Sequence, residues 1–263
     1  MTHSPAGGIA PAHIIRQMVE QGHIVADAPL DADQVQPASL DLRLGELAWR
    51  VRASFMPGRH NTVADRLEQL SLHKIDLTKG AVLEVGCVYI VPLREHLKLP
   101  RGVSAAANPK SSTGRLDIFT RVIADYATHF EQVPDGYDGP LYAEISPRTF
   151  PILARTGSRL SQIRFRQGEF VSDDALIHRL HDERPLVTSG DVNIDNGIAL
   201  SIDLSSFGDG QPVGFRAKRH SGLVDVDKKA ALNVLDYWDP IWQPGSLILD
   251  PDQFYILASK EAV

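Results

Sequence analysis

Short strand-forming runs, separated by glycine and proline, make up most of this chain. Apolar and polar residues alternate in 40–44 and again in 162–165, and this two-residue period is typical of half-buried strands. The 20 glycines and 17 prolines punctuate these runs as turns would. Helical patterns are short by comparison; one covers 12–21, with Gly22 following as a C-cap. We therefore expect a mainly β fold with a few short helices.

An internal repeat divides the chain into two parts. The matching segments, in chain order, are 39–42 with 201–204, Arg52-Ala53 with Arg216-Ala217, Leu83-Glu84 with Leu249-Asp250, and Tyr89-Ile90 with Tyr255-Ile256. The spacing between partners changes only slightly along the chain, as differences in loop length would produce. Matches at three closely similar spacings (162, 164 and 166 residues), in the same order along the chain, favour a duplicated unit over chance.

The repeat predicts three regions. Residues 11–172 form a complete copy, 173–189 a linker helix, and 190–263 an incomplete second copy. The second copy ends before any counterpart of the segment that follows residue 108 in the first. Because half of a barrel would leave strand edges unpaired, we expect the sequence to be a fragment, or a truncated product, of a longer tandem protein.

The segment Pro-Lys-Ser-Ser-Thr-Gly-Arg-Leu at 109–116 concentrates hydroxyls, cations and a glycine, which are the groups that hold phosphate oxygens. Within it, Ser111 and Arg115 are four residues apart and would share one face of a helical turn. Glu144 stands alone in the apolar run 141–145, where a carboxylate removed from water can serve as a general base. The combination suggests a nucleotide-handling enzyme.

Charge and composition exclude several classes of partner. The net charge of -6 argues against general nucleic-acid binding, which needs a basic face. No stretch reaches the roughly 18 apolar residues of a membrane span, and the N-terminus has no signal-peptide pattern, so we expect a cytoplasmic protein without a membrane partner. From Arg148 to Arg166 there are five arginines and no acid. They form either a solvated strand face or a positive wall near a phosphate site.

Four segments, in this order, resemble the deoxycytidine triphosphate deaminase family of the deoxyuridine triphosphatase-like superfamily. They are 36–45 (Gln-Pro-Ala-Ser-Leu-Asp-Leu-Arg-Leu-Gly), 110–116, Gly136-Tyr137-Asp138-Gly139 with Glu144 five residues beyond, and Arg159-Leu160-Ser161-Gln162-Ile163. The first is very like the family's Q-P-A-S-x-D-L-R-L-G and is highly specific. The similarity covers about residues 12–170, and the tandem layout is similar to the long, double-domain version found in some bacteria.

This resemblance implies a distorted β-barrel of the deoxyuridine triphosphatase-like type, with a partial second copy, that assembles as a homotrimer with active sites where subunits meet. The implied reaction is hydrolytic deamination of deoxycytidine triphosphate (dCTP) to deoxyuridine triphosphate (dUTP) and ammonia. The implied cofactor is Mg²⁺ that travels with the triphosphate, and no zinc. Zinc deaminases need His/Cys/Cys ligands, which a chain with Cys87 as its single cysteine cannot supply, and His178 and His181 have no third ligand nearby in sequence. We therefore predict no metal site built from protein ligands.

The resemblance assigns the catalytic roles to three residues. Glu144 takes a proton from the water that attacks cytosine and passes it toward the leaving ammonia, without a metal. Arg115 reaches into the catalytic pocket beside the glutamate. Ser111 positions the water or a nearby backbone group.

Other residues are implied to bind the substrate. Lys110 and Ser112 would contact phosphates, with lysine replacing the family's usual arginine and so losing its bidentate fork. Gln162 would donate to a phosphate. Backbone groups from Val122 to Ala124 would recognise the base. Asp41 would orient its motif or help to hold hydrated magnesium, and we favour the structural role.

Two departures from the family pattern concern recognition of the base, and two other functions stay open. The link 124–133 is longer than usual, and Pro134 or Asp135 stands where family members place an aspartate.

A dUTP pyrophosphatase, or a bifunctional deaminase and pyrophosphatase, would need an aspartate such as Asp125 or Asp135 to align water on the α-phosphate. A non-catalytic nucleotide-binding or assembly module would hold the nucleotide without turnover.

Overall fold

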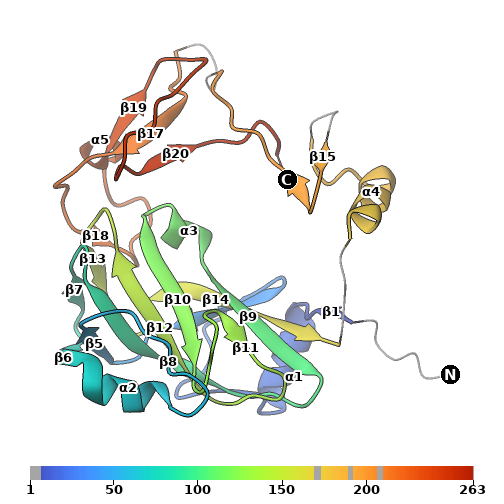
Figure 1. Ribbon diagram of the computed structural model, residues 1–263, viewed down its shortest axis with the longest axis vertical. Helices are drawn as coiled ribbons and strands as arrows, with labels where there is room; N and C mark the ends of the chain where they lie inside the picture. The colour runs from blue at the N-terminus through green and yellow to red at the C-terminus, as the bar shows by residue number, and fades with distance from the viewer. Residues whose placement is uncertain (1–6, 169–172, 189–191, 206–209, 263) are drawn as a thin grey trace. The chain divides into compact units, whose positions relative to one another are not determined.

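The computed structural model describes residues 7–168, 173–188, 192–205 and 210–262. The chain forms two compact units: the first contains Met1–Glu169 together with Gly222–Ala231, and the second contains Phe170–Ser221 with Leu232–Val263. Strands dominate and the helices are short (Figure 1), which confirms the predicted mainly β fold. No helix among these described residues is long and apolar enough to cross a membrane.

One six-stranded sheet of the first unit, counted over the described residues, carries the predicted alternating strand at 162–165. Its strands, in spatial order, are β11 (Gln132–Val133), β9 (Val103–Pro109), β14 (Arg159–Gln167), β4 (Ser39–Arg43) and β3 (Val35–Gln36), with β1 (Gly8–Ile9) paired to β14. Ile163 and Phe165 are fully buried, whereas Arg164 and Arg166 are exposed. This alternation points one face of β14 into the core and the other away from it.

A second six-stranded sheet in the same part of the structure carries Glu144. Its strands, in spatial order, are β10 (Ile118–Ala124), β12 (Asp138–Pro147), β8 (Val88–Lys98), β5 (Leu47–Val51) and β6 (Ser71–Asp76), with β2 (Ile24–Ala26) paired to β8. A bridge between Leu44 and Leu93 links the two sheets. Leu42 and Val91, which are fully buried, belong to the core that the two sheets supply.

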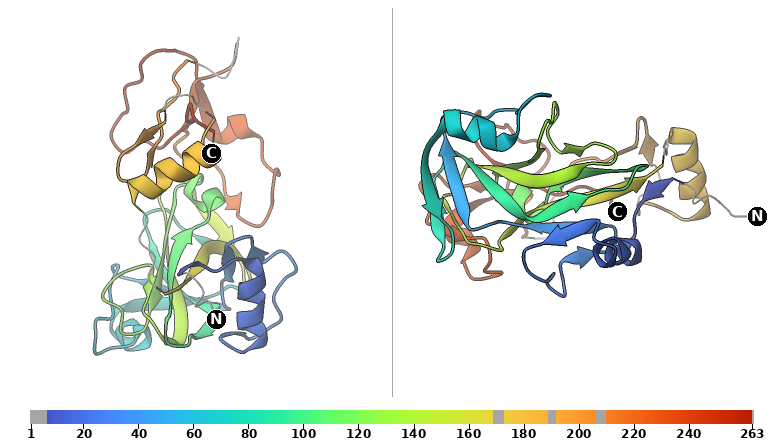
Figure 2. Two further views of the ribbon diagram at one scale, coloured as in Figure 1. Left: turned by 90° about the vertical axis from the view of Figure 1, so that its right-hand side faces the viewer. Right: turned by 90° about the horizontal axis from the view of Figure 1, so that it is seen from below.

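Two helices lie on opposite sides of these sheets (Figure 2). α1 (Ala12–Glu20) confirms the helix predicted at 12–21, and Gly22 has the positive φ of 74° expected after a helix end. α2 (Val63–Leu70) was not predicted; Thr62 and the acid three residues later form a capping box at its start. The second helix covers a small core made of Val51, Val63, Leu67, Ile90, Ile123 and Tyr142.

A three-stranded sheet joins distant parts of the sequence within the first unit. β13 (Ile152–Ala154) pairs antiparallel with β7 (Ala81–Leu83) and parallel with β18 (Val224–Asp225). β18 comes from the region predicted to form only the second copy. No pattern in the sequence predicted this docking.

The second unit is described by itself. Its elements are α4 (Asp174–Glu183), β15 (Asn193–Ile194), β16 (Ile198–Ala199), β17 (Gly214–Ala217), α5 (Val234–Tyr237), β19 (Trp238–Ile241) and β20 (Tyr255–Leu257). α4 lies within the predicted linker 173–189 and begins after Asp173, whose carboxylate accepts a hydrogen bond from the Leu176 N–H at 2.7 Å. β17 pairs with both β19 and β20.

The internal repeat is visible in strand pairing. Arg50 of β5 lies opposite Tyr89 of β8, and at the corresponding spacing Arg216 of β17 lies opposite Tyr255 of β20. Each tyrosine hydroxyl accepts a backbone N–H five residues earlier, at 3.0 Å and 3.1 Å. The predicted match of Arg216 with Arg52 is wrong by two positions, because the strand register equates Arg216 with Arg50.

Candidate active site

A pocket of about 560 Å³ lies where β9 passes into α3 (Ser111–Gly114). Its lining includes Asp33, Asp41, Lys110, Ser111, Ser112 and Gln162. The structure therefore brings together Lys110, Ser112 and Gln162, which were predicted to bind phosphates, and places Ser111, which was predicted to act in catalysis, beside them. We call this space the phosphate pocket.

Hydrogen bonds to β14, and one within the turn itself, hold the turn that carries these groups. The backbone N–H of Lys110 and the hydroxyl of Thr113 both donate to the Leu160 carbonyl, at 2.9 Å and 2.8 Å. The Arg115 N–H donates to the Ser111 carbonyl at 3.0 Å, so these two residues share a helical turn as predicted. Both serines of the turn stay exposed, and their hydroxyls have no protein partner among the described residues.

Carboxylates neutralise two cations of the phosphate pocket. The Lys110 ammonium forms an ion pair with Asp41, whose side chain is 2% exposed. Arg159 donates to both carboxylate oxygens of Asp33, at 2.9 Å and 3.1 Å, and lies 3.7 Å from Asp41. The hydrogen bond from Arg159 holds the pKa of Asp33 below its usual value, and the charge of Lys229 adds to this effect. A phosphate that enters must therefore compete with carboxylates for these cations.

Gln162 of β14 presents donors to the same pocket. Its side-chain carbonyl accepts a hydrogen bond from the Ser39 hydroxyl at 2.9 Å. This contact turns the carbonyl away and leaves the NH₂ group without a partner among the described residues. An amide held in this way offers two N–H donors to a phosphate oxygen.

Glu144 of β12 lies directly opposite Arg121 of β10. The carboxylate is 1% exposed, and its Oε1 accepts hydrogen bonds from Arg121 Nη2 at 2.6 Å and Nε at 3.2 Å. Its Oε2 is buried and has no partner among the described residues. Because a buried carboxylate oxygen without a donor costs free energy, Oε2 marks a place for a water molecule or a substrate group.

The guanidinium of Arg121 is fixed by several neighbours. It lies 3.5 Å from the centre of the Phe130 ring and 4.7 Å from that of Phe119, and it donates to the Ser54 hydroxyl at 2.8 Å. Arg121 was not among the predicted site residues. A lone cation in the apolar run 118–124 is the same kind of signal as a lone carboxylate in such a run, and could have found it.

The other predicted site residues lie outside the phosphate pocket. Arg115 is exposed, and its side chain forms no hydrogen bond or ion pair with a described residue. Val122 and Ala124 are buried in β10, and their carbonyls accept N–H groups of the following loop at 2.8 Å and 3.3 Å. Glu144 does not line the phosphate pocket either. One chain therefore carries two groups of candidate residues, one around the phosphates and one around Glu144.

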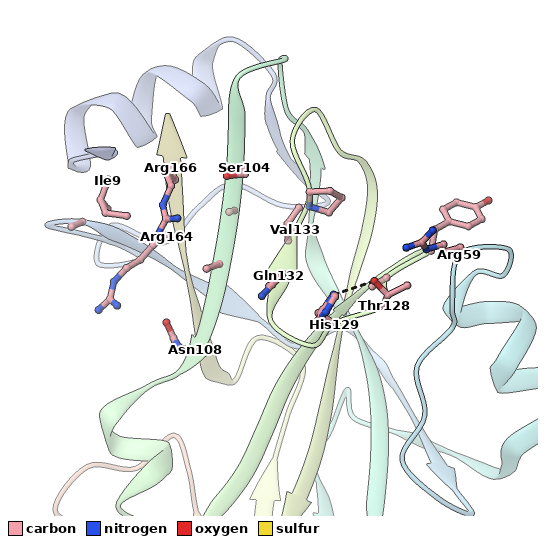
Figure 3. Close-up of a pocket in the computed structure, with 16 residues that line it drawn as sticks. Ile9, Arg59, Ser104, Asn108, Thr128, His129, Gln132, Val133, Arg164 and Arg166 are labelled. Carbon is pink, nitrogen blue, oxygen red and sulfur yellow. Dashed lines mark hydrogen bonds between the residues drawn. The ribbon is translucent and has the colours of Figure 1, made fainter. Parts of the chain in front are cut away.

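A larger cavity, of about 950 Å³, follows the exposed face of β9 and β14 and the loop at 126–134. Arg164 and Arg166 reach it from β14, beside Asn108 of β9, while His129 comes from the loop (Figure 3). Of the five arginines at 148–166, Arg159 thus lines the phosphate pocket and two others line this cavity.

The candidate aspartates for pyrophosphatase chemistry are not in the phosphate pocket. Asp125 accepts the Val63 N–H at 2.7 Å at the start of α2, and burial raises its pKa. Asp135 is exposed, and neither lines the phosphate pocket. Across the described residues, no group of three or more His, Cys, Asp or Glu is arranged to hold a metal ion.

Comparisons with known proteins agree over nearly the whole chain. The family profile of the 2'-deoxycytidine 5'-triphosphate deaminase N-terminal domain matches residues 6–169, and that of the C-terminal domain matches 173–263. A crystal structure of 2'-deoxycytidine 5'-triphosphate deaminase from Agrobacterium tumefaciens is similar, with a TM-score of 0.94 and 57% identity, over 98% of this chain and 78% of that one.

More distant relatives match 60–67% of the sequence. A dCTP deaminase of Halorubrum lacusprofundi is 30% identical over 162 residues, which is 60% of this chain and 76% of the relative. A dUMP-forming dCTP deaminase of Methanosphaera stadtmanae is 27% identical over 180 residues, which is 67% of this chain and 87% of the relative.

Proposed function

The chain belongs to the 2'-deoxycytidine 5'-triphosphate deaminase family and is an enzyme that deaminates dCTP, and we propose that Glu144 is the base that activates the attacking water. The observation that carries this proposal is the asymmetry of the carboxylate. Arg121 holds Oε1 with two hydrogen bonds, while the buried Oε2 has no partner among the described residues. The free oxygen is the one that can take a proton.

The proposed reaction exchanges an amino group for an oxygen at C4 of cytosine. Glu144 Oε2 removes one proton from a water molecule while the oxygen of that water forms a bond to C4. The same carboxyl group then passes this proton to the amino nitrogen, the C4–N bond breaks, and ammonia leaves. The remaining proton of the added hydroxyl moves to N3, which gives the C4 carbonyl and the N3–H group of uracil. Glu144 returns to its ionised form, and Arg121 stays protonated and keeps the carboxylate in one orientation throughout.

Substrate binding is proposed to use the phosphate pocket. Lys110 would exchange its carboxylate partner for a phosphate oxygen, and the exposed Ser112 hydroxyl and the Gln162 amide would donate to others. Ser111, on the same turn, keeps its proposed role of positioning the water or a nearby backbone group. Backbone groups from Val122 to Ala124 would hold the base close to Glu144, which lies on the neighbouring strand.

Magnesium is proposed to arrive with the triphosphate. Asp41 is already paired with Lys110, and Asp33 with Arg159. The pocket thus offers few free carboxylates, and this donor set suits a cation held mostly by phosphate oxygens and water. The proposed chemistry at C4 uses Glu144 and needs no zinc.

Assembly into a homotrimer is proposed because the two groups of candidate residues are separate on one chain. The phosphate pocket does not include Glu144, and the exposed side chain of Arg115 has no partner among the described residues. A neighbouring subunit could supply the phosphate-binding group to the Glu144 group, with Arg115 reaching across. A cytoplasmic location stays a prediction from the sequence.

Replacement of Glu144 by Gln tests the role of the base. We expect the turnover of dCTP to fall about a thousandfold, because the amide cannot accept the proton, while the Kd for dCTP changes little. Glu131→Gln is the matched control, since Glu131 is a nearby half-buried carboxylate that the mechanism does not use. Near-normal turnover of the Glu144 variant would show that another group is the base.

A second candidate function is conversion of dCTP directly to dUMP. It is favoured by the name of the Methanosphaera stadtmanae relative, which is dUMP-forming. Anion-exchange separation of the nucleotides after incubation with dCTP and magnesium decides between the two. Accumulation of dUTP with ammonia supports deamination alone, and dUMP formed without free dUTP supports both reactions in one enzyme.

A further inference from the structure

The segment Gly222–Ala231 belongs to the second half of the sequence but packs as part of the first unit. Its strand β18 lies beside β13 in a parallel pair (Figure 1), and Val224 is 5% exposed. The N–H groups of Val224 and Val226 donate to the carbonyls of Pro151 and Leu153 at 3.0 Å and 3.3 Å. The segment is therefore an integral part of this unit.

Charged contacts fix the segment in one position. Arg155 donates to both carboxylate oxygens of Asp225, at 2.7 Å and 2.8 Å, and to Asp227 at 3.1 Å. The hydroxyl of Ser158, a buried residue, donates to Asp227 at 2.7 Å. Gly80 leaves room for the arginine stem, because a Cβ there would lie 3.1 Å from it. A bidentate pair of this kind specifies position as well as affinity.

The docked segment contributes to the phosphate pocket. Val226, Asp227 and Lys229 line it together with Lys110 and Arg159. Lys110 and Arg159 are each paired with a carboxylate, whereas Lys229 forms no ion pair with any described residue. Among the described residues, the cation of this pocket that is free to meet a phosphate thus comes from the second half of the sequence.

We propose that Gly222–Ala231 completes the triphosphate site and that Lys229 binds phosphate oxygens of dCTP. The proposal rests on the proposed function, since it takes the pocket at Lys110 as the place of the phosphates. It gives the second half of the sequence a direct part in substrate binding, in addition to any part in assembly. The ligand class is a nucleoside triphosphate, whose outer phosphates carry most of the charge.

Replacement of Lys229 by Ala tests the proposal by titration calorimetry with dCTP and with deoxycytidine monophosphate. We expect the Kd for dCTP to rise about tenfold, which corresponds to the loss of one hydrogen bond to a charged group. Binding of the monophosphate should change less than threefold, because it lacks the outer phosphates. Lys228→Ala is the matched control: Lys228 is the adjacent residue, its side chain is 67% exposed, and it does not line the pocket. The control should bind dCTP within twofold of the wild type.

Lys110→Ala separates failure of this inference from failure of the proposed function. If Lys110→Ala weakens dCTP binding and Lys229→Ala does not, the pocket holds phosphates and the role of Lys229 is refuted. If neither variant weakens binding, the phosphate pocket itself is wrong. Equal loss of dCTP and monophosphate binding in Lys229→Ala would also contradict a contact with the outer phosphates. Unchanged melting temperatures, expected for the exposed Lys229 and Lys228, show that these two variants are folded. Lys110 is half-buried and pairs with the buried Asp41, so the fold of Lys110→Ala is checked by comparing its far-UV circular dichroism spectrum with that of the wild type.

Discussion

Replacement of Arg121 should show how much of the stability of the first unit depends on its ion pair with Glu144. In Arg121→Gln the carboxylate, which is 1% exposed, loses both hydrogen bonds to Oε1 and remains buried. Breaking a buried ion pair from one side costs about 3–5 kcal/mol. Because the Arg121 side chain is 23% exposed, we take the lower end, about 3 kcal/mol. For a unit of this size, that loss lowers the melting temperature by about 6–12 °C.

The assay is thermal unfolding of four proteins: wild type, Arg121→Gln, Glu144→Gln and the double variant. The double variant has no buried charge and should be more stable than Arg121→Gln alone, by about 1–2 kcal/mol. Arg94→Gln is the control, because Arg94 pairs with the exposed Asp27 at 2.6 Å and its loss should cost at most about 1 kcal/mol. A wild-type melting temperature for Arg121→Gln, or strictly additive losses in the double variant, would refute the reasoning.

Burial raises the pKa of Tyr142 to about 12, so the folded protein keeps this phenol neutral after the unfolded chain has ionised near pH 10. The stability that this group contributes is present below pH 10 and is lost as the pH rises toward 12. The free energy of unfolding should therefore fall less steeply between pH 10 and 12 in Tyr142→Phe than in the wild type. An equal fall in the two proteins would contradict this. Gly139→Ala would place a Cβ 2.5 Å from the Tyr137 hydroxyl and should cost about 1–3 kcal/mol in a denaturant titration, whereas Gly8→Ala meets no atom within 4 Å and should be neutral. Equal stability of the two alanine variants would contradict that steric argument. A chelator should leave the melting temperature unchanged while weakening dCTP binding, and a large loss of stability would reveal a structural metal.

Local patterns in the sequence were enough to predict several features. The alternation at 162–165 gave the inward and outward faces of β14, because the two-residue period follows from strand geometry alone. The spacing of Ser111 and Arg115 gave their shared turn for the same reason. α2 was not predicted, although its signal is local too: a threonine, with an acid three residues later, stands at the start of an apolar pattern and forms a capping box.

Features that depend on distant pairing could not be predicted in the same way. The contact of Arg121 with Glu144 requires the register of β10 on β12, which the connecting loop sets. The docking of β18 on β13 joins residues about seventy positions apart, and nothing in the sequence near Asp225 names Arg155 as its partner. The repeat was found from matching residues, but its exact register at Arg216 needed the strand pairs.

The most direct test of the central claim is chemical rescue of a Glu144→Ala variant. With saturating dCTP, the variant should release almost no ammonia, and added formate should restore part of the rate by supplying a carboxylate beside Arg121. Chloride at the same concentration should restore nothing. If the variant turns over dCTP at the wild-type rate, or binds dCTP normally but gains no activity from formate, Glu144 is not the group that moves the proton.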